Sequence, residues 1–263
     1  MGEYFKVGFP GACMLCFEWW CFELLAIFSG LMSVEALAAE VIIVNIVSFI
    51  FMIPLGISYA ASSITGVYLG FEMIPQAKKF SRLTILFNVF VTIIVLILFK
   101  SFQVQIAELF TKDKGVNVII YDVINILCLY IFFDTIHGVQ SGIIRGLGLQ
   151  KWGSIYTLIC YWPIGLLTAL MFAFKRDLGV YGLWLGFSIA CIILDIGFAC
   201  IIECPDWYRI SKEMQKNIDM ETVKKVADEP DAVSEQEVAS KSGATPEQTR
   251  YIAGQLVSGR KHA

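Results

Sequence analysis

Six long apolar stretches constrain this chain more than any other feature of its sequence. They lie at residues 10–31, 37–59, 83–102, 121–144, 153–174 and 180–202. A helix needs about 20 mostly apolar residues to cross the hydrocarbon core of a bilayer, and each stretch has roughly that length. The stretches are continuous and lack the alternation of a membrane β-strand. The sequence therefore predicts an all-α, polytopic membrane protein with a bundle of six transmembrane helices.

Charge is distributed unevenly along the chain. Charged residues make up only 16% of the 263 residues and concentrate toward the C-terminus, whereas a soluble domain carries about 25%. We predict a cytosolic N-terminal segment at 1–9, the bundle at 10–203, and a largely disordered, polar, cytosolic tail at 204–263. The start of that tail, 207–226, is expected to form a surface helix. The connectors are short, which favours antiparallel neighbours in one bundle.

Two longer connectors, 70–82 and 100–115, are expected to be polar loops with room for short interfacial helices. Lys and Arg set the orientation of such a bundle, because they gather in cytosolic loops. Nine of them lie on one side of the predicted bundle and five on the other, which places both termini in the cytosol. The expected location is the plasma membrane or a vacuolar or other organellar membrane.

Several classes of function find no support in the sequence. The basic residues form no patch that could follow a phosphate backbone, so nucleic acid is not an expected partner. The pair Cys13-x-x-Cys16 has no second pair or His cluster to complete a metal site, so no metal is expected. No catalytic triad or phosphate loop is present, and we expect neither an enzyme nor a bound cofactor.

Acidic residues inside the apolar stretches are the strongest functional signal. Ionisable groups at membrane depth are costly and usually face a bundle interior or a wet cavity. Glu18 and Glu23 lie in the first stretch, about 140° apart around a helix. A carboxylic acid removed from water can take up and release a proton near neutral pH, which suits proton carriage. The alternative is a pair of carboxyl groups that are hydrogen-bonded within the bundle.

Asp134 is a third deep acid, and it heads a polar stripe on the fourth helix. His137 lies three residues further and therefore on the same face, followed by Ser141. Glycines 138, 142 and 146 recur at steps of four, which permits close helix approach or leaves room for a ligand. His137 can equally be an ordinary packing residue. The candidates for a substrate cavity are His137, Gln140, Ser141, Asn45, Trp19, Tyr130, Tyr161 and Asp195, the aromatic ones as stacking partners for an organic cation.

Two prolines are predicted to break helices. Pro54 with Gly56 interrupts the second stretch, and Pro163 with Gly165 interrupts the fifth. Each proline removes a helix hydrogen bond and permits a kink. Transporters use such breaks to expose backbone or to bend, but static kinks are equally compatible with the pattern.

Between about residues 10 and 203, the order and spacing of these motifs resemble the C-terminal half of the multidrug and toxic compound extrusion (MATE) family. The matching segments are Glu18-Trp-Trp-Cys-Phe-Glu23, Leu37-Ala-Ala39, Ile53-Pro-Leu-Gly56, Ala60-Ala-Ser62, Asp134 with Gln140-Ser-Gly142, Arg145-Gly146-Leu-Gly148-Leu-Gln150 and Gly179-Val-Tyr-Gly-Leu-Trp184-Leu-Gly186. The resemblance implies two six-helix lobes around a cavity, and exchange of organic cations or metabolites for protons or sodium ions. It also implies that Glu18, Glu23 and Asp134 take part in cation binding and proton coupling. We expect Glu23 and Asp134 to hold the exchanged protons or cations, with Glu18 assisting.

By the same resemblance, the chain begins just before the seventh-helix equivalent. We expect a six-helix lobe that works with a second lobe or as a homodimer, unless the chain is a truncated or degenerate copy. The predicted function is a secondary antiporter that exports an organic cation or other small molecule, driven by a proton or sodium gradient in the lipid bilayer. The alternatives are a structural or assembly fragment without transport activity, and a flippase for a lipid-linked substrate.

Overall fold

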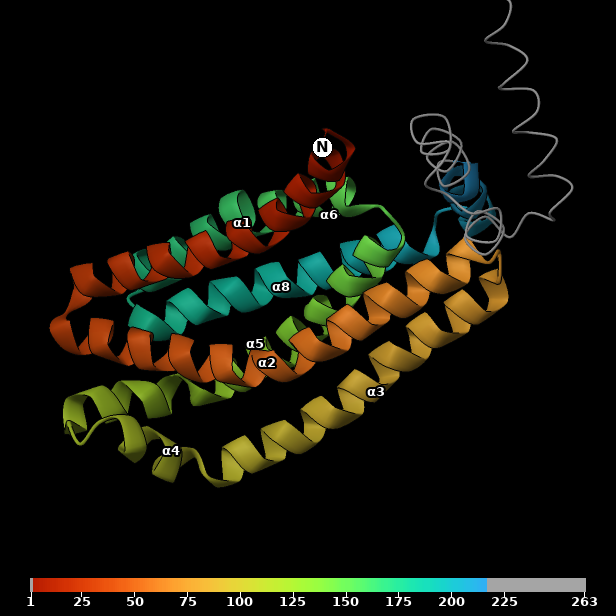
Figure 1. Cartoon of the computed structure of the whole chain (residues 1–263). Coiled ribbons are helices and arrows are strands. Elements are labelled where there is room, and N and C mark those ends of the chain that lie inside the picture. Colours follow the sequence, from red (N-terminus) through yellow and green to blue (C-terminus); the bar gives the residue numbers. More distant parts are fainter. Residues whose placement is uncertain (1, 217–263) are drawn as a thin grey trace, which may run out of the picture. The chain divides into compact units, whose positions relative to one another are not determined.

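A computed structural model describes residues 2–216 of the chain, with side chains from residue 8 onward (Figure 1). This part contains helices and no strand. Two segments within the fifth span have the wider π-helical turn and are labelled η1 and η2. The elements are α1 (Gly2–Met32), α2 (Val34–Gly70), α3 (Ile74–Ser101), α4 (Gln103–Phe110), α5 (Lys114–Gly146), α6 (Gln150–Ile159), η1 (Cys160–Leu166), α7 (Leu167–Leu170), η2 (Met171–Lys175) and α8 (Gly179–Glu203).

The six predicted membrane-spanning stretches are confirmed as helices. By length and composition, six helical segments in the described part of the chain can cross a membrane. Their mean hydropathies lie between 1.6 and 2.5, so each favours lipid over water along its core. These spans are Gly8–Met32, Val34–Gly70, Ile74–Ser101, Lys114–Gly146, Gln150–Lys175 and Gly179–Glu203.

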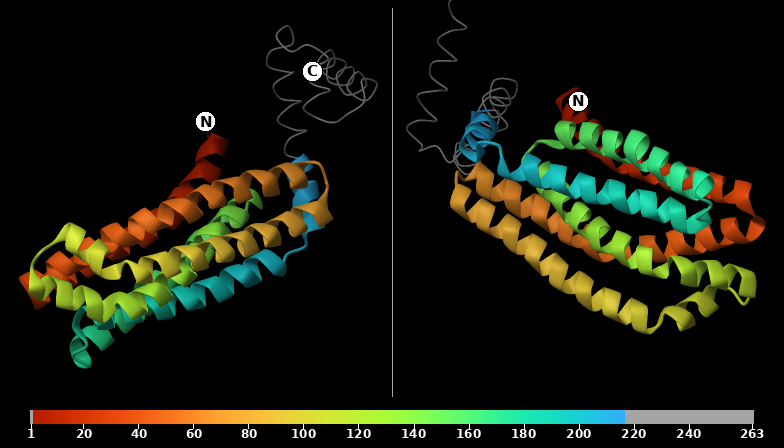
Figure 2. Two further views of the ribbon diagram at one scale, coloured as in Figure 1. Left: turned by 90° about the horizontal axis from the view of Figure 1, so that it is seen from below. Right: turned by 180° about the vertical axis from the view of Figure 1, so that it is seen from behind.

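The chain divides into two compact units. Unit 1 comprises Met1–Tyr68 and Pro75–Pro205, and unit 2 comprises Leu69–Ile74 and Asp206–Ala263. Within unit 1, α5 packs along α8, and α1 packs along α6. The views in Figures 1 and 2 show these long helices side by side, as the short connectors predict.

The helices extend further than hydropathy alone indicates. The predicted polar loop at 70–82 is wrong, because α2 ends at Gly70, α3 begins at Ile74, and both are regular up to a tight turn. α2 has 37 residues and is therefore about 55 Å long, well beyond the thickness of a hydrocarbon core. A helix satisfies its own backbone hydrogen bonds, so its polar ends need no lipid to stay helical.

The predicted loop at 100–115 contains one short helix, α4, as expected. After α4, the carboxylate of Asp113 accepts a hydrogen bond from the backbone N–H of Gly115 at 2.7 Å and caps α5. This cap fixes the start of α5, which carries more buried polar side chains than any other described helix.

The two prolines behave differently. α2 continues through Pro54, so the predicted interruption of that helix is wrong. Pro54 is buried, and the two α2 residues closest to Gly138 of α5 are Phe51 and Pro54, which shows tertiary packing at this point. Pro163 lies within η1, so a local departure from α-helix does occur at the second predicted break. A proline lacks the N–H that an α-turn needs, and a π-turn accommodates that loss.

Glycines bring helices of unit 1 into close backbone contact, as the spacing of the α5 stripe predicts. A side chain at Gly142 would overlap Ser58 of α2, and one at Gly146 would lie 2.6 Å from the Ser62 carbonyl oxygen. On α8, Gly182 and Gly186 approach the backbone of residues 173 and 169 in the same way. These contacts need residues without a Cβ atom.

Unit 2 contains a helical segment at 207–216, where the predicted surface helix begins. The Asp206 carboxylate accepts a hydrogen bond from the Tyr208 N–H at 3.0 Å and caps this segment. Ser211 donates a hydrogen bond to the Leu69 carbonyl at 2.6 Å. The remainder of the predicted tail lies outside the described residues.

Replacement of a contact glycine should destabilise the bundle. In Gly186→Ala, the new methyl group would overlap the backbone of Ala169, so we expect a loss of about 1–3 kcal/mol of unfolding free energy. Gly56→Ala is the matched control, because nothing lies within 4 Å of a methyl group there. Its expected change is a slight gain, since alanine favours helix. Thermal unfolding of the purified variants in detergent measures both, and equal unfolding temperatures would contradict the close packing.

Candidate functional site

Buried ionisable side chains from three helical segments meet inside unit 1. Glu18 of α1 has 4% of its surface exposed, Asp134 of α5 has 2%, and His137 of α5 has 3%. These are the residues that an apolar bundle tolerates least, so their mutual contacts determine what the site can do.

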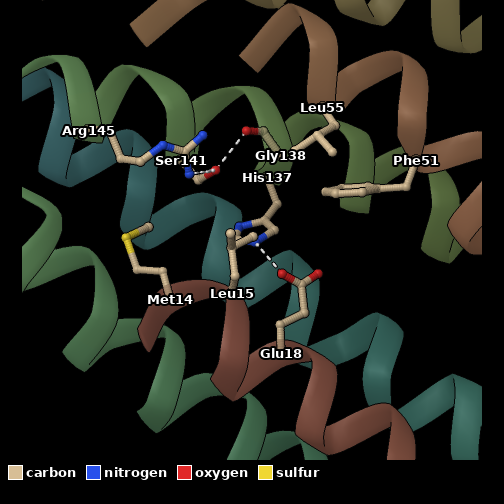
Figure 3. A pocket seen from close by; sticks show the side chains of 9 residues that line it. All are labelled: Met14, Leu15, Glu18, Phe51, Leu55, His137, Gly138, Ser141 and Arg145. Carbon is tan, nitrogen blue, oxygen red and sulfur yellow. Dashed lines mark hydrogen bonds and ion pairs between the residues drawn. The ribbon is translucent and has the colours of Figure 1, made fainter. Parts of the chain in front are cut away.

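Glu18 is the meeting point of these groups. Its Oε2 atom lies 3.5 Å from Nε2 of His137, as Figure 3 shows. Its Oε1 atom accepts a hydrogen bond from the hydroxyl of Tyr161 in η1 at 3.4 Å. The indole N–H of Trp162 donates to the Phe17 carbonyl at 3.1 Å and ties η1 to α1 beside this contact.

Asp134 completes the arrangement. The hydroxyl of Tyr130, one helical turn earlier, donates a hydrogen bond to Oδ1 of Asp134 at 3.0 Å. Asp134 also interacts with both Glu18 and His137. We call Glu18, Tyr130, Asp134, His137 and Tyr161 the acidic cluster. The two carboxyl groups lie among two phenol hydroxyl groups and an imidazole, an arrangement that suits the holding of a proton.

Aromatic rings enclose the acidic cluster. Trp184 of α8 stacks edge-on against Tyr130 at a centroid distance of 5.0 Å, and Phe187 packs against Tyr161 at 5.7 Å. Phe198 packs against the ring of His137 at 5.1 Å. Such rings exclude water and lower the local dielectric, which strengthens each polar contact inside.

A pocket lies beside the acidic cluster, and Glu18 and His137 both belong to its lining (Figure 3). Arg145 lines this pocket. Its guanidinium donates hydrogen bonds to Ser141 Oγ at 3.3 Å and to Ser58 Oγ at 2.9 Å. The lining comes from α1, α2 and α5. It consists of Met14, Leu15, Glu18, Phe51, Leu55, His137, Gly138, Ser141 and Arg145.

Other predicted site residues lie away from the acidic cluster. Glu23 is exposed on unit 1, because five residues of helix rotate it away from Glu18. Trp19 is 43% exposed, and Asn45 is exposed with its amide bonded to the Val41 carbonyl at 2.7 Å. The structure therefore does not bring Glu23, Trp19 or Asn45 together with Asp134.

Two further candidates are buried on their own. Asp195 of α8 is 7% exposed, and neither of its carboxylate oxygens has a hydrogen-bond partner among the described residues. Gln140 is 6% exposed, and its side-chain oxygen also lacks one there. Both remain predictions as substrate contacts. In the described part of the chain, no group of three or more His, Cys, Asp and Glu side chains could hold a metal ion.

Sequence reasoning missed the partners that other segments supply. Glu40 of α2 is fully buried and accepts a hydrogen bond from the indole N–H of Trp184 at 2.9 Å. Ser58 and Arg145 were not candidates, although Arg145 lines the pocket and Ser58 accepts a hydrogen bond from its guanidinium. The sequence did contain one signal for Arg145: it is a cation between two apolar stretches, next to Gly142 and Gly146.

Comparison with known proteins gives consistent matches. A sequence model of the family described as MatE matches residues 10–171. Multidrug and toxin extrusion protein 1 of Oryctolagus cuniculus is 29% identical over 211 residues, which cover 80% of this chain and 37% of that protein. Multidrug and toxin extrusion protein 2 of Homo sapiens is 30% identical over 217 residues, with 82% and 36% covered. The chain thus spans little more than a third of these relatives.

Solved structures give the same result for the fold. The eukaryotic MATE transporter AtDTX14 superposes with a TM-score of 0.78 at 27% identity, covering 82% of this chain and 49% of that one. The Vibrio cholerae MATE transporter VcmN in its bent form superposes with a TM-score of 0.73 at 17% identity, covering 78% and 47%. The second match concerns the fold alone.

The bond between Trp184 and Glu40 should be important for stability. Trp184→Phe leaves a fully buried carboxyl group without its indole donor, at a cost of about 1–3 kcal/mol. Adding Glu40→Leu to that variant should recover part of the loss, because the unpaired group is gone. Trp152→Phe, at a 62% exposed position, serves as the control. Unfolding temperatures in detergent would reject this role if all three variants matched the native chain.

Proposed function

Because the chain belongs to the MatE family of multidrug and toxin extrusion transporters, we propose that it forms one six-helix lobe of a secondary antiporter. The proposed activity is export of an organic cation or another small molecule in exchange for protons. One observation carries this proposal: Glu18 and Asp134, 116 positions apart in the sequence, are both buried in one cluster, where Glu18 contacts His137 one turn along α5 from Asp134. A transporter lobe needs such a site, and a purely structural bundle gains nothing from two adjacent buried acids.

The chemistry of the acidic cluster favours a proton as the exchanged ion. Two carboxyl groups that face each other away from water are least costly when they share a proton. Tyr130, Tyr161 and His137 provide hydrogen-bond donors to these carboxyl groups, which leaves few free oxygen atoms for a sodium ion. We propose that protonation and deprotonation of this pair bias the lobe between two conformations, as alternating access requires.

Glu23 has a separate place in the proposed mechanism. Its carboxyl group is exposed on unit 1, on the same helix as Trp19. A carboxylate and an indole at such a surface can attract and stack against an organic cation. We therefore propose that Glu23 and Trp19 contribute to cation attraction, and that Glu18 with Asp134 contributes to proton coupling.

A lobe of this kind needs a second wall for its cavity. The relatives are about two to three times as long as the matched part of this chain, so a second lobe in the same assembly or a second copy of the chain is the proposed partner. Both termini are proposed to lie in the cytosol, on the basis of the Lys and Arg distribution.

Neutral substitutions separate the two proposed roles. Glu18→Gln or Asp134→Asn should lower pH-gradient-driven export by the complete assembly by about 10- to 100-fold, because no proton can be exchanged at the substituted position. Glu23→Gln should raise the KM for an organic cation and leave the gradient dependence intact. Glu108→Gln in α4, an exposed acid outside the candidate spans, is the control.

The measurement is uptake of a fluorescent organic cation into proteoliposomes with an imposed pH gradient, repeated with a sodium gradient. Export that follows the sodium gradient alone would contradict proton coupling. Native rates in both Glu18→Gln and Asp134→Asn would remove the acidic cluster from the mechanism.

A further inference from the structure

His137 lies at the boundary between the acidic cluster and the pocket. Its Nε2 atom is 3.5 Å from Glu18 Oε2, while its Nδ1 atom is buried without a hydrogen-bond partner among the described residues. The pocket lining includes both His137 and Glu18 (Figure 3). An imidazole with one nitrogen on a carboxylate and the other unpartnered can accept a proton at one atom and donate it from the other.

The surroundings of His137 are mainly apolar. The α2 residues of the pocket are Phe51 and Leu55, and Phe198 of α8 packs against the imidazole at 5.1 Å. Among titratable side chains, Glu18 faces His137 from α1 and Tyr161 from η1. Asp134 and Arg145 belong to α5 itself, with Asp134 on the cluster side and Arg145 in the pocket lining.

We propose that His137 relays protons between water in the pocket and the Glu18 carboxyl group. This inference rests on the proposed proton coupling and adds the residue and the route. His137 is then a relay residue that loads the coupling site, distinct from Glu18 and Asp134, which hold the proton.

The relay step is balanced. A hydronium ion in the pocket transfers a proton to Nδ1 and becomes water. The imidazolium then transfers its Nε2 proton to the Glu18 carboxylate, which becomes a neutral carboxylic acid, and the imidazole remains neutral with its proton on Nδ1. Exchange of that proton through pocket water and reprotonation at Nε2 restore the first tautomer.

Arg145 places a fixed positive charge in the pocket lining. Ser141 and Ser58 hold its guanidinium there, and the Tyr59 ring lies 5.8 Å from its central carbon. A fixed positive charge in a narrow, partly apolar pocket repels mobile cations. Arg145 therefore keeps metal ions and organic cations away from the carboxyl groups, and a proton enters the pocket against the same repulsion.

The rate at which Glu18 and Asp134 become protonated tests the relay directly. The purified full chain in nanodiscs is exposed to a rapid drop in pH, and the infrared band of protonated carboxyl groups is followed over time. Glu18→Gln and Asp134→Asn identify the part of the band that belongs to the cluster. His137→Gln retains a hydrogen-bond donor but cannot relay a proton, so it should keep the amplitude of that part and slow its appearance by about tenfold or more.

A second variant keeps the test decisive if His137→Gln fails to fold. Leu15→Phe enlarges a side chain of the pocket lining and leaves His137 and Glu18 themselves in place, and it should slow protonation in the same way. Tyr156→Phe, which removes a different hydrogen bond between α6 and the Ile193 carbonyl, is the control and should keep the native rate.

A native rate in His137→Gln, or in Leu15→Phe when only that variant folds, overturns the relay. A cluster band that does not respond to pH overturns it as well. Because the readout is protonation and not export, loss of transport in the native chain would count against the proposed function and leave this test intact.

Discussion

The arrangement of the acidic cluster and its pocket depends on the close approach of α5 to α2 at Gly142 and Gly146. With no side chain at Gly142, Ser58 can donate a hydrogen bond to the Gly138 carbonyl at 2.6 Å. The same hydroxyl group accepts a hydrogen bond from Arg145, so one contact fixes both the α2–α5 packing and the cation in the pocket lining. In lipid, where apolar burial gives little preference between helix pairs, such packing and hydrogen bonding decide which helices associate.

Hydropathy predicted the helices but not their full lengths. The six spans stand out because lipid requires continuous apolar runs, and the structure has a helix on each. The loop predicted at 70–82 failed because hydropathy reports which residues prefer lipid, whereas helix formation also continues through polar residues. At Pro54 the sequence predicted a break, but α2 is continuous there. A sequence pattern does not show that packing around a proline can keep a helix continuous.

Within one helix, the site followed from periodicity. Asp134 and His137 share a face because they are three residues apart, and the glycines at steps of four do make the predicted contacts. Across helices, periodicity gives no answer. Glu18 and Glu23 are the same residue type on the same apolar helix. Only the rotation of α1 against α5 and η1 decides that Glu18 is buried and Glu23 exposed. Tyr161 and Arg145 acquire their partners in the same way, from segments distant in the chain.

The wider turn at η1 has a consequence for how this lobe tolerates length changes. A π-turn contains one residue more than the α-turn it replaces, so it resembles an insertion that the helix has absorbed. Deletion of one residue between Tyr161 and Gly165 would let the segment return to an α-helix while both flanks keep nearly their present rotation, because six α-helical residues turn about as far as seven π-helical ones. Tyr161, which donates to Glu18, and Gly165, which lies against Ala190, would then be three residues apart and still share one face. A one-residue alignment gap at this point in other lobes of this kind is therefore compatible with an unchanged geometry of the acidic cluster.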